Sequence, residues 1–224
     1  MQNAVRLILG TASQSSWSMR AFLCASPLIQ SLTIDWRTFD VNDRLADASG
    51  CPTGKVPVLY PSRAEVIVES FAIAETLAEL GGLQWPEDRR DRASARSLCL
   101  EFQAASDDLR KSVPMDLSSV GNVLAPHPDL IVWMQRLDKL LQQSDGPFLY
   151  GHLSIADAWF SPVIARAVRC DVLSTASLNA YFEALKLTQC WRCWMGYVDN
   201  PSPIYVSLSM QSRLNAPRLV QYAA

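Results

Sequence analysis

The chain has 224 residues, of which 49% are hydrophobic and 19% are charged. This length suits one large domain or two small ones and supplies ample material for a core. Twenty Lys and Arg residues against 22 Asp and Glu residues give a formal net charge of -2, which argues against a nucleic-acid partner. No stretch approaches the roughly 20 apolar residues of a membrane span, and no secretion signal is recognisable. We therefore expect a cytoplasmic protein that binds neither nucleic acid nor membrane.

Cysteines and histidines limit the possible chemistry. The six cysteines are scattered through apolar or helical segments, so we expect buried free thiols. Cys190 and Cys193 have the spacing of a redox or metal half-site, but a second half is missing, and a redox role is the weaker alternative. The two histidines, His127 and His152, have no evident partners for a catalytic triad or a zinc ion. The sequence thus predicts no metal site.

Strand and helix patterns alternate at the start of the chain. Residues 4–10 form a short apolar run typical of a buried strand, and residues 15–26 have helical spacing. Residues 33–39 partly alternate between apolar and polar, as a half-buried strand does. A strand, a helix and a strand in succession predict two parallel strands with a right-handed crossover.

Two more strands and a helix follow. Residues 56–60 and 65–69 are apolar runs joined by turn-forming residues, which predicts a β-hairpin. Residues 70–80 have the pattern of a helix, with a serine at the N-cap and two glycines after its end. With one additional strand, the resulting order is the βαββα order of a thioredoxin-like domain. The predicted fold is therefore an N-terminal α/β thioredoxin-like domain over residues 1–80.

Nearly everything after residue 81 has helical periodicity. Helices are predicted at about 87–113, 129–143, 154–169, 177–187 and 188–198. Ser154 and Asp157 form a variant capping box at the start of the third of these helices. We predict a linker and start of the helical domain over 81–92, an all-helical C-terminal domain over 93–200, and a tail over 201–224 that is partly ordered by packing.

Pro57 is unusual within a strand-like run, because proline removes a hydrogen-bond donor from the ladder. A cis Val56–Pro57 bond would explain its position and would leave the Val56 N–H and C=O free to pair with an extended peptide. An ordinary edge-strand proline is the alternative.

Two helix starts carry serines that suit anions. Glu69 and Ser70 precede one helix, where hydroxyl and N–H groups can hold a carboxylate. Ser15 and Ser16 precede another, where similar donors can stabilise a thiolate and lower its pKa. Each pair is also what ordinary capping would give. Together they predict a pocket for a small peptide that carries a thiol.

The sequence resembles the cytosolic glutathione transferases over nearly the whole chain up to about residue 199. Four segments carry the resemblance, in order and at the family's spacing: SSWSMR (15–20), PTGKVPVL (52–59), ESFAIAETLAE (69–79) and GPFLYGHLSIADA (146–158). Residues 15–18 are similar to the serine motif of the zeta-like and related bacterial members. The resemblance implies a two-domain homodimer in which the first half binds glutathione and the helical half shapes a pocket for a hydrophobic electrophile.

The resemblance also implies roles for individual residues. Ser15, with Ser16 beside it, matches the serine that hydrogen-bonds the glutathione sulfur. Val56, which precedes the family's cis-proline at Pro57, matches the residue whose backbone pairs with the cysteinyl unit of glutathione.

The other implied contacts hold the two ends of glutathione. Glu69 and Ser70 match the pair that binds the γ-glutamyl end, and Lys55 lies near the glycyl carboxylate. Ser154 and Asp157 match the family's helix-capping motif, which supports folding.

Departures from the family pattern leave alternatives open. Ser13 and Gln14 stand where relatives often carry Asn-Tyr, so the sulfur ligand is one of Ser13, Ser15 and Ser16. Residues 101–110 lack the Met-His pair of close bacterial relatives, so the electrophile is not defined.

Three further residues, Trp17, Met115 and Tyr205, either line the electrophile site or pack in the core, and Cys24 is expected in the core. The expected activity is that of a glutathione transferase. The alternatives are a glutathione-dependent isomerase of the maleylacetoacetate type and a binding module without catalysis.

Overall fold

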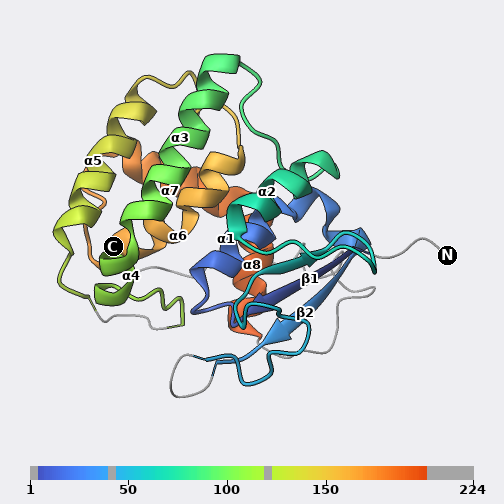
Figure 1. Cartoon of the computed structure of the whole chain (residues 1–224). Coiled ribbons are helices and arrows are strands. Elements are labelled where there is room, and N and C mark those ends of the chain that lie inside the picture. Colours follow the sequence, from blue (N-terminus) through green and yellow to red (C-terminus); the bar gives the residue numbers. More distant parts are fainter. Residues whose placement is uncertain (1–4, 40–43, 119–122, 201–224) are drawn as a thin grey trace.

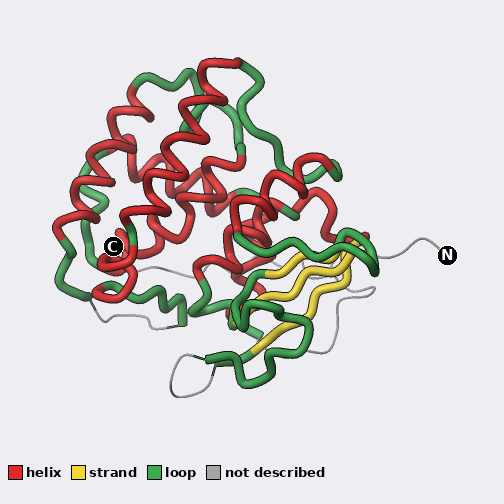
Figure 2. Tube along the Cα trace, in the orientation of Figure 1, coloured by secondary structure: helices red, strands yellow, loops and turns green. Residues whose placement is uncertain are grey.

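The computed structural model describes residues 5–39, 44–118 and 123–200. A small sheet occupies one end of the molecule and helices form the rest (Figure 1; Figure 2). The strands are β1 (Val5–Gly10), β2 (Leu32–Arg37) and β3 (Val58–Tyr60), in the order β2-β1-β3. β1 is parallel to β2 and antiparallel to β3. The predicted parallel pair is confirmed, and α1 (Ser16–Cys24) with a short 3-10 helix (Ser26–Ser31) forms its crossover.

The central strand β1 is buried on both faces. Leu7 and Leu9 point into the main core, whereas Ile8 points to the opposite face and joins a smaller cluster with Val58 and Cys51. Successive side chains of a strand alternate between its faces, so a strand covered on both sides needs a continuous apolar run. This explains why residues 7–9 show no polar alternation.

The second strand of the predicted hairpin, residues 65–69, is not a strand in this structure. Only Ile67 pairs with β3: its N–H donates to Leu59 O at 2.8 Å, and Leu59 N–H donates to Ile67 O at 3.0 Å. The extended conformation cannot continue, because Glu69 has a φ of 68° and starts α2 (Ser70–Glu79). The order β1, α1, β2, β3, α2 is nevertheless the βαββα order of the predicted thioredoxin-like domain.

The helical part follows α2. Its helices within the described residues are α3 (Arg89–Ala105), α4 (Asp107–Ser112), α5 (Pro128–Gln142), α6 (Ile155–Arg169), α7 (Ala176–Leu187) and α8 (Gln189–Asp199). The single helix predicted over 87–113 is wrong, because Ser106 separates α3 from α4. Its hydroxyl donates to Gln103 O, a local bond of the kind that competes with regular helix bonding. The other four helices begin and end within one residue of the prediction.

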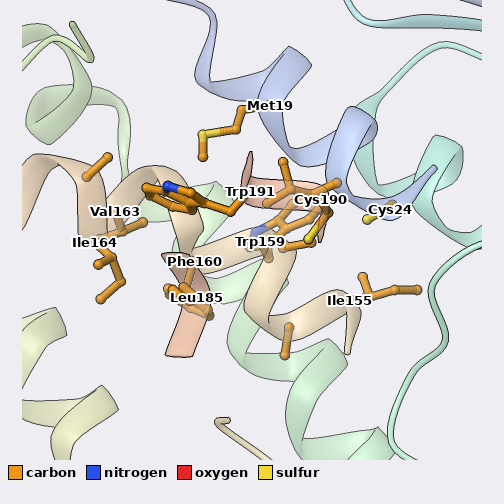
Figure 3. Packing of buried hydrophobic residues seen from close by; sticks show 14 of the residues in the cluster. Met19, Cys24, Ile155, Trp159, Phe160, Val163, Ile164, Leu185, Cys190 and Trp191 are labelled. Atoms are coloured by element: carbon orange, nitrogen blue, oxygen red, sulfur yellow. The ribbon is translucent and has the colours of Figure 1, made fainter. Parts of the chain in front are cut away.

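One continuous apolar core joins the sheet to the helices, and α6 lies at its centre. Almost every residue of α6 is buried, as expected for a helix surrounded by other elements. Figure 3 shows Met19 of α1 and Trp191 of α8 near Trp159 and Phe160 of α6. The core therefore fixes α1, and with it the candidate serines, relative to the helical part.

Ser154 and Asp157 form the predicted capping box at the start of α6. The fully buried Asp157 carboxylate accepts hydrogen bonds from Leu149 N–H at 3.0 Å and from Ser154 N–H at 2.8 Å. It also accepts from the Ser154 hydroxyl at 3.0 Å and from the Tyr181 hydroxyl at 3.1 Å. One side chain thus ties the loop before α6 to both α6 and α7.

Asp157 should make stability depend on pH. Burial raises its pKa to about 6 from the ordinary 3.8, because loss of water disfavours the charged form. The pKa of Asp157 is higher in the folded than in the unfolded state. The stability that comes from its protonated side chain is therefore fully present below pH 3.8 and is lost as the pH rises through about 6. We predict that the free energy of unfolding, measured in urea, falls by about 2 kcal/mol more between pH 4 and pH 7 in the wild type than in Asp157→Asn. Equal pH slopes in the two proteins would contradict this.

Candidate functional site

Ser15 caps the N-terminus of α1. Its backbone is extended (φ -87°, ψ 91°), and its side-chain oxygen accepts from Ser18 N–H at 3.4 Å. The first turn of α1 contains no acidic residue. The positive end of the helix dipole is therefore not neutralised by a side chain of that turn, and an anion placed there would be stabilised.

Ser15 belongs to a small cluster of hydrogen-bonding groups at the end of β1. The Ser15 and Ser18 hydroxyls lie 2.8 Å apart, and Gly10 N–H donates to Ser18 Oγ at 2.9 Å. Ser18 is completely buried, and Ser15 is 8% exposed. The cluster holds the Ser15 side chain at the start of the helix.

The other two candidate serines are held differently. Ser16 is 4% exposed, and its hydroxyl has no hydrogen-bond partner among the described residues. The half-buried Ser13 accepts, through its backbone carbonyl, from Leu117 N–H at 3.0 Å. Of the three serines, Ser15 is the one that caps the helix.

The Val56–Pro57 peptide bond is cis, as predicted. Val56 lies beside the end of β1: a Cβ atom placed on Gly10 would be only 2.9 Å from Val56 Cγ2. The Val56 N–H and C=O have no hydrogen-bond partner within the part of the chain that the structure describes. Both groups are therefore free to bond to a ligand backbone. Lys55 precedes them on the surface, and no contact among the described residues ties it to the other candidates.

The start of α2, unlike that of α1, has no side-chain cap. Glu69 occupies the N-cap position with φ 68° and ψ 121°, a left-handed conformation that is uncommon for glutamate. No side chain caps this helix, and its first turn has no acidic residue. The first N–H groups of α2, next to the buried Ser70, are thus open to an anionic group. Strained backbone of this kind clusters at ligand sites.

The first turns of α1 and α2 meet at one indole ring of α6. The Trp17 ring lies 6.0 Å from the Trp159 ring, and the Phe71 ring lies 5.6 Å from it. Trp17 follows the candidate serines of α1, and Phe71 follows Ser70 of α2. The fold therefore brings the two predicted anion-binding helix starts together, although they are more than 50 residues apart in sequence.

The three residues considered for the electrophile pocket have different positions. Met115 is 4% exposed and packs in the core, as the packing alternative predicts. Trp17 is half-buried at the start of α1. Tyr205, and the tail over 201–224 to which it belongs, lie outside the described residues.

Buried arginines beside Trp17 are a feature that the sequence analysis missed. The fully buried Arg20 donates to Trp159 O at 2.8 Å and to Ser16 O at 3.2 Å, and its guanidinium lies 4.3 Å from the Trp17 ring. The Arg110 guanidinium lies 4.8 Å from the same ring. Burial lowers the pKa of Arg20, and the nearby positive charges of Arg166 and Arg110 lower it further. Arg20 is three residues after Trp17 and four before Cys24, so the helical spacing placed it on the same face as these two side chains, but it did not indicate the acceptors that bury it.

The protein's own cysteines do not offer a reactive thiol. All six are free and buried, and burial raises the pKa of each of them. Cys24 is fully buried in the core, as expected. Cys190 and Cys193 are buried in α8, which agrees with structural thiols. A nucleophilic thiolate at this site would have to come from a ligand.

Two absences concern only the residues that the structure describes. No helix among them has the length and apolar character needed to cross a bilayer. In the same ranges, no three side chains of the His, Cys, Asp or Glu type gather as metal ligands would.

Comparison with known proteins identifies the fold. No family model matches the chain, and no curated protein matches it in sequence. Solved structures do match: a glutathione transferase homolog from Burkholderia BGR1 with bound glutathione is 22% identical, with a TM-score of 0.61, over 89% of this chain and 99% of that one. The chain has the glutathione transferase fold.

Other solved structures agree. Maleylacetoacetate isomerase from Anaeromyxobacter dehalogenans 2CP-1 is 21% identical, with a TM-score of 0.60, over 92% of this chain and 96% of that one. Glutathione transferase Omega 2C from Trametes versicolor is 17% identical, with a TM-score of 0.64, over 86% of this chain and 93% of that one. The predicted fold class, a thioredoxin-like half followed by a helical half, is thus confirmed as that of the glutathione transferases.

Gly10 offers a test of the contact between β1 and Val56 in this glutathione transferase fold. A Cβ at Gly10 would lie 2.8 Å from Phe39 Cζ and 2.9 Å from Val56 Cγ2, so Gly10→Ala must displace both side chains. We predict that the free energy of unfolding, measured in urea, falls by about 1 kcal/mol.

Gly196 supplies the matched control for this substitution. It lies within α8, and a Cβ there would meet no atom within 4 Å. Gly196→Ala should raise stability by about 0.5 to 1 kcal/mol, because alanine favours the helix. A loss of stability in Gly196→Ala as large as that in Gly10→Ala would contradict the close contact between Gly10 and Val56.

Proposed function

We propose that the protein is a glutathione transferase that stabilises the thiolate of glutathione for attack on a hydrophobic electrophile. Two observations carry the proposal. The Ser15 hydroxyl lies at the start of α1, whose first turn has no acidic residue, and Ser18 links it to Gly10 at the end of β1. Val56 lies against the same Gly10, and its backbone N–H and C=O have no partner among the described residues. The glutathione transferase fold and the bound glutathione in two similar structures support it.

The candidate residues suit the chemical parts of glutathione. The free N–H and C=O of Val56 can pair with the backbone of the cysteinyl unit. The open first turn of α2, with Glu69 and Ser70, suits the carboxylate and ammonium of the γ-glutamyl end. Lys55, on the surface beside Val56, suits the glycyl carboxylate. Ser15, with Ser16 next to it, faces the remaining part, the sulfur.

Glutathione supplies the nucleophile, and the protein supplies charge stabilisation and position. A thiol with a pKa of about 8.5 is mostly protonated at neutral pH. A hydroxyl donor from Ser15 and the dipole of α1 both favour the thiolate, and the thiol proton leaves to solvent. When the sulfur bonds to the electrophilic carbon, the leaving group departs with the electron pair of its former bond.

An isomerase is a second candidate, favoured by the similarity to a maleylacetoacetate isomerase structure. The same site would serve it, because addition of a thiolate to a conjugated alkene, bond rotation and elimination of the thiolate leave the cofactor unchanged. Comparing turnover of an activated aryl halide with isomerisation of a cis-enone dicarboxylate separates the two reactions.

Titration calorimetry with glutathione tests the proposal directly. We expect binding at submillimolar to millimolar concentration and an ultraviolet thiolate band in the complex at neutral pH. An absence of binding at millimolar glutathione would reject the proposal and favour a binding module without catalysis.

Assembly and location are part of the same proposal. We propose a cytoplasmic homodimer, with glutathione and a small hydrophobic electrophile as its partners. Sedimentation that gives the mass of a single chain across micromolar concentrations would contradict the dimer.

A further inference from the structure

Trp159 of α6 is a fixed point of the core that the proposed function does not use. It is fully buried, and its indole Nε1–H donates to Cys99 O of α3 at 2.9 Å. Its backbone carbonyl accepts from Arg20 Nε of α1 at 2.8 Å. Because a well-packed core leaves a side chain bonded in this way little freedom, the position of the indole ring is set by α1, α3 and α6 together.

The first turns of α1 and α2 each place an aromatic ring against this indole. The Trp17 ring centroid lies 6.0 Å from it with an interplanar angle of 64°, and the Phe71 ring centroid lies 5.6 Å from it with an angle of 78°. Both are edge-type contacts, whose geometry is more specific than that of aliphatic packing. Trp17 comes directly after Ser16, and Phe71 comes directly after Ser70. The indole therefore links the two helix starts that the proposed function assigns to glutathione.

Phe71 has a second aromatic neighbour. Its ring lies 5.6 Å from the Trp85 ring, and Trp85 Nε1–H donates to Glu75 Oε1 of α2 at 3.0 Å. Arg96 Nε of α3 donates to the same carboxylate oxygen at 2.9 Å. Phe71 thus packs against two indole rings, each of which is hydrogen-bonded to another part of the core. A shift of the start of α2 relative to α6 would break one of these two ring contacts.

The spacing of the two helix starts matters because glutathione would bridge them. In the proposed function its sulfur lies at Ser15 and its γ-glutamyl end lies at Glu69 and Ser70. When a ligand binds at two points, the second point adds affinity only if the distance between the points fits the ligand. A displacement of about 1 Å at a reacting group also costs a large factor in rate.

We propose that Phe71, seated on Trp159, is a positioning residue that sets the distance between the thiol site at α1 and the γ-glutamyl site at α2. It thereby determines selectivity for glutathione over thiols that lack a γ-glutamyl group. Phe71 needs no contact with the ligand, since it acts through Glu69 and Ser70, the two residues before it. This inference rests on the proposed function, because it requires glutathione to reach both helix starts.

Phe71→Leu tests the inference in the full-length protein. Leucine keeps the position apolar but removes the ring contacts with Trp159 and Trp85. We expect the Kd for glutathione, measured by titration calorimetry, to rise about tenfold. If Phe71→Leu does not fold, Phe71→Met carries the same test, because methionine fills irregular gaps in a core.

A fragment of glutathione separates position from stability. In N-acetylcysteinylglycine an acetyl group replaces the γ-glutamyl group, so this thiol reaches the α1 site but not the α2 site. We expect the ratio of kcat/KM for glutathione to kcat/KM for the fragment, with an activated aryl halide, to fall about tenfold in Phe71→Leu. For the fragment itself, kcat/KM should change less than about twofold, because Ser15 and Val56 are unaltered. Partial unfolding lowers both rates by the same factor and leaves the ratio unchanged.

Phe182→Leu is the matched control. Phe182 of α7 makes an edge-type contact with Trp191 of α8, with 5.7 Å between ring centroids, and neither helix carries a candidate site residue. This control should lose stability without a change in the glutathione Kd or in the ratio. Phe71→Tyr should keep the wild-type ratio, because the half-buried ring is retained. The inference is overturned by an unchanged ratio in folded Phe71→Leu or Phe71→Met, or by an equal fall in Phe182→Leu or Phe71→Tyr.

The outcomes also separate this inference from the proposed function. If the wild type binds no glutathione at millimolar concentration, the proposed function fails and the inference fails with it. If the wild type turns over glutathione and the fragment equally well, α2 does not hold the γ-glutamyl end, and the inference falls while the role of Ser15 stands. If glutathione keeps its full advantage in Phe71→Leu, only the role of Phe71 is wrong.

Discussion

Ser15→Ala should raise the pKa of the bound glutathione thiol by about one to two units and lower kcat/KM at neutral pH by about 10- to 100-fold. The substitution removes the hydroxyl at the start of α1 and leaves the dipole of the helix in place. Activity should recover as the pH rises, because the thiolate then forms without help. The pH profile of kcat/KM with an activated aryl halide measures both effects.

The same variant should remain folded. Loss of the Ser15 cap costs about 1 kcal/mol of stability, which circular dichroism during urea unfolding would detect as a modest shift. Ser13→Ala and Ser16→Ala complete the comparison, because they remove the two other hydroxyls near the start of α1. If one of them raises the thiol pKa and Ser15→Ala does not, that serine is the sulfur ligand.

Asp157→Ala should destabilise the protein by about 3 kcal/mol at neutral pH. This is the largest loss of stability that we expect from any of the substitutions considered. The carboxylate is the acceptor for Leu149 N–H, Ser154 N–H and the Tyr181 hydroxyl, all of which are buried. Its removal leaves these donors unpaired and releases the loop before α6 from α7. Urea unfolding monitored by tryptophan fluorescence measures the loss.

Asp129→Ala is the matched control for Asp157→Ala. Asp129 also lies in the first turn of a helix, α5, but its side chain is 51% exposed. Its loss should cost less than about 1 kcal/mol, because its interactions with the helix dipole and with His127 Nδ1, 3.7 Å away, are weak at an exposed position. Similar losses in the two variants would show that the buried hydrogen bonds of Asp157 contribute little.

Local patterns were sufficient for most elements. The apolar run of β1, the helical spacing of α5 to α8 and the capping box of Ser154 and Asp157 follow from the order of neighbouring residues, and their positions agree with the structure. The absence of a strand at residues 65–69 and the helix break at Ser106 could not be inferred from neighbouring residues. The pairing of a strand and the break of a helix depend on what the rest of the chain places beside them.

The candidate site shows the same division. The sequence placed serines at two helix starts and a proline in a strand-like run, and it supported a cis Val56–Pro57 bond, which the structure has. It did not show that Arg20 lies fully buried against Trp17, nor that Ser18 faces Ser15. Arginine in a helix is usually solvated, so its burial depends on acceptors such as Trp159 O, supplied 139 residues further along the chain.

By itself, the sequence determined the order of strands and helices and the residue types at their ends, because periodicity and capping are properties of neighbours along the chain. Only the tertiary structure decided that the starts of α1 and α2 meet at Trp159 and that the Gly10 N–H bonds to Ser18. The contacts at Trp159 join segments far apart in sequence, whereas the Gly10–Ser18 bond spans eight residues at the turn from β1 into α1. The contacts at Trp159 form because α6 is buried on nearly every side and is covered by both halves of the chain.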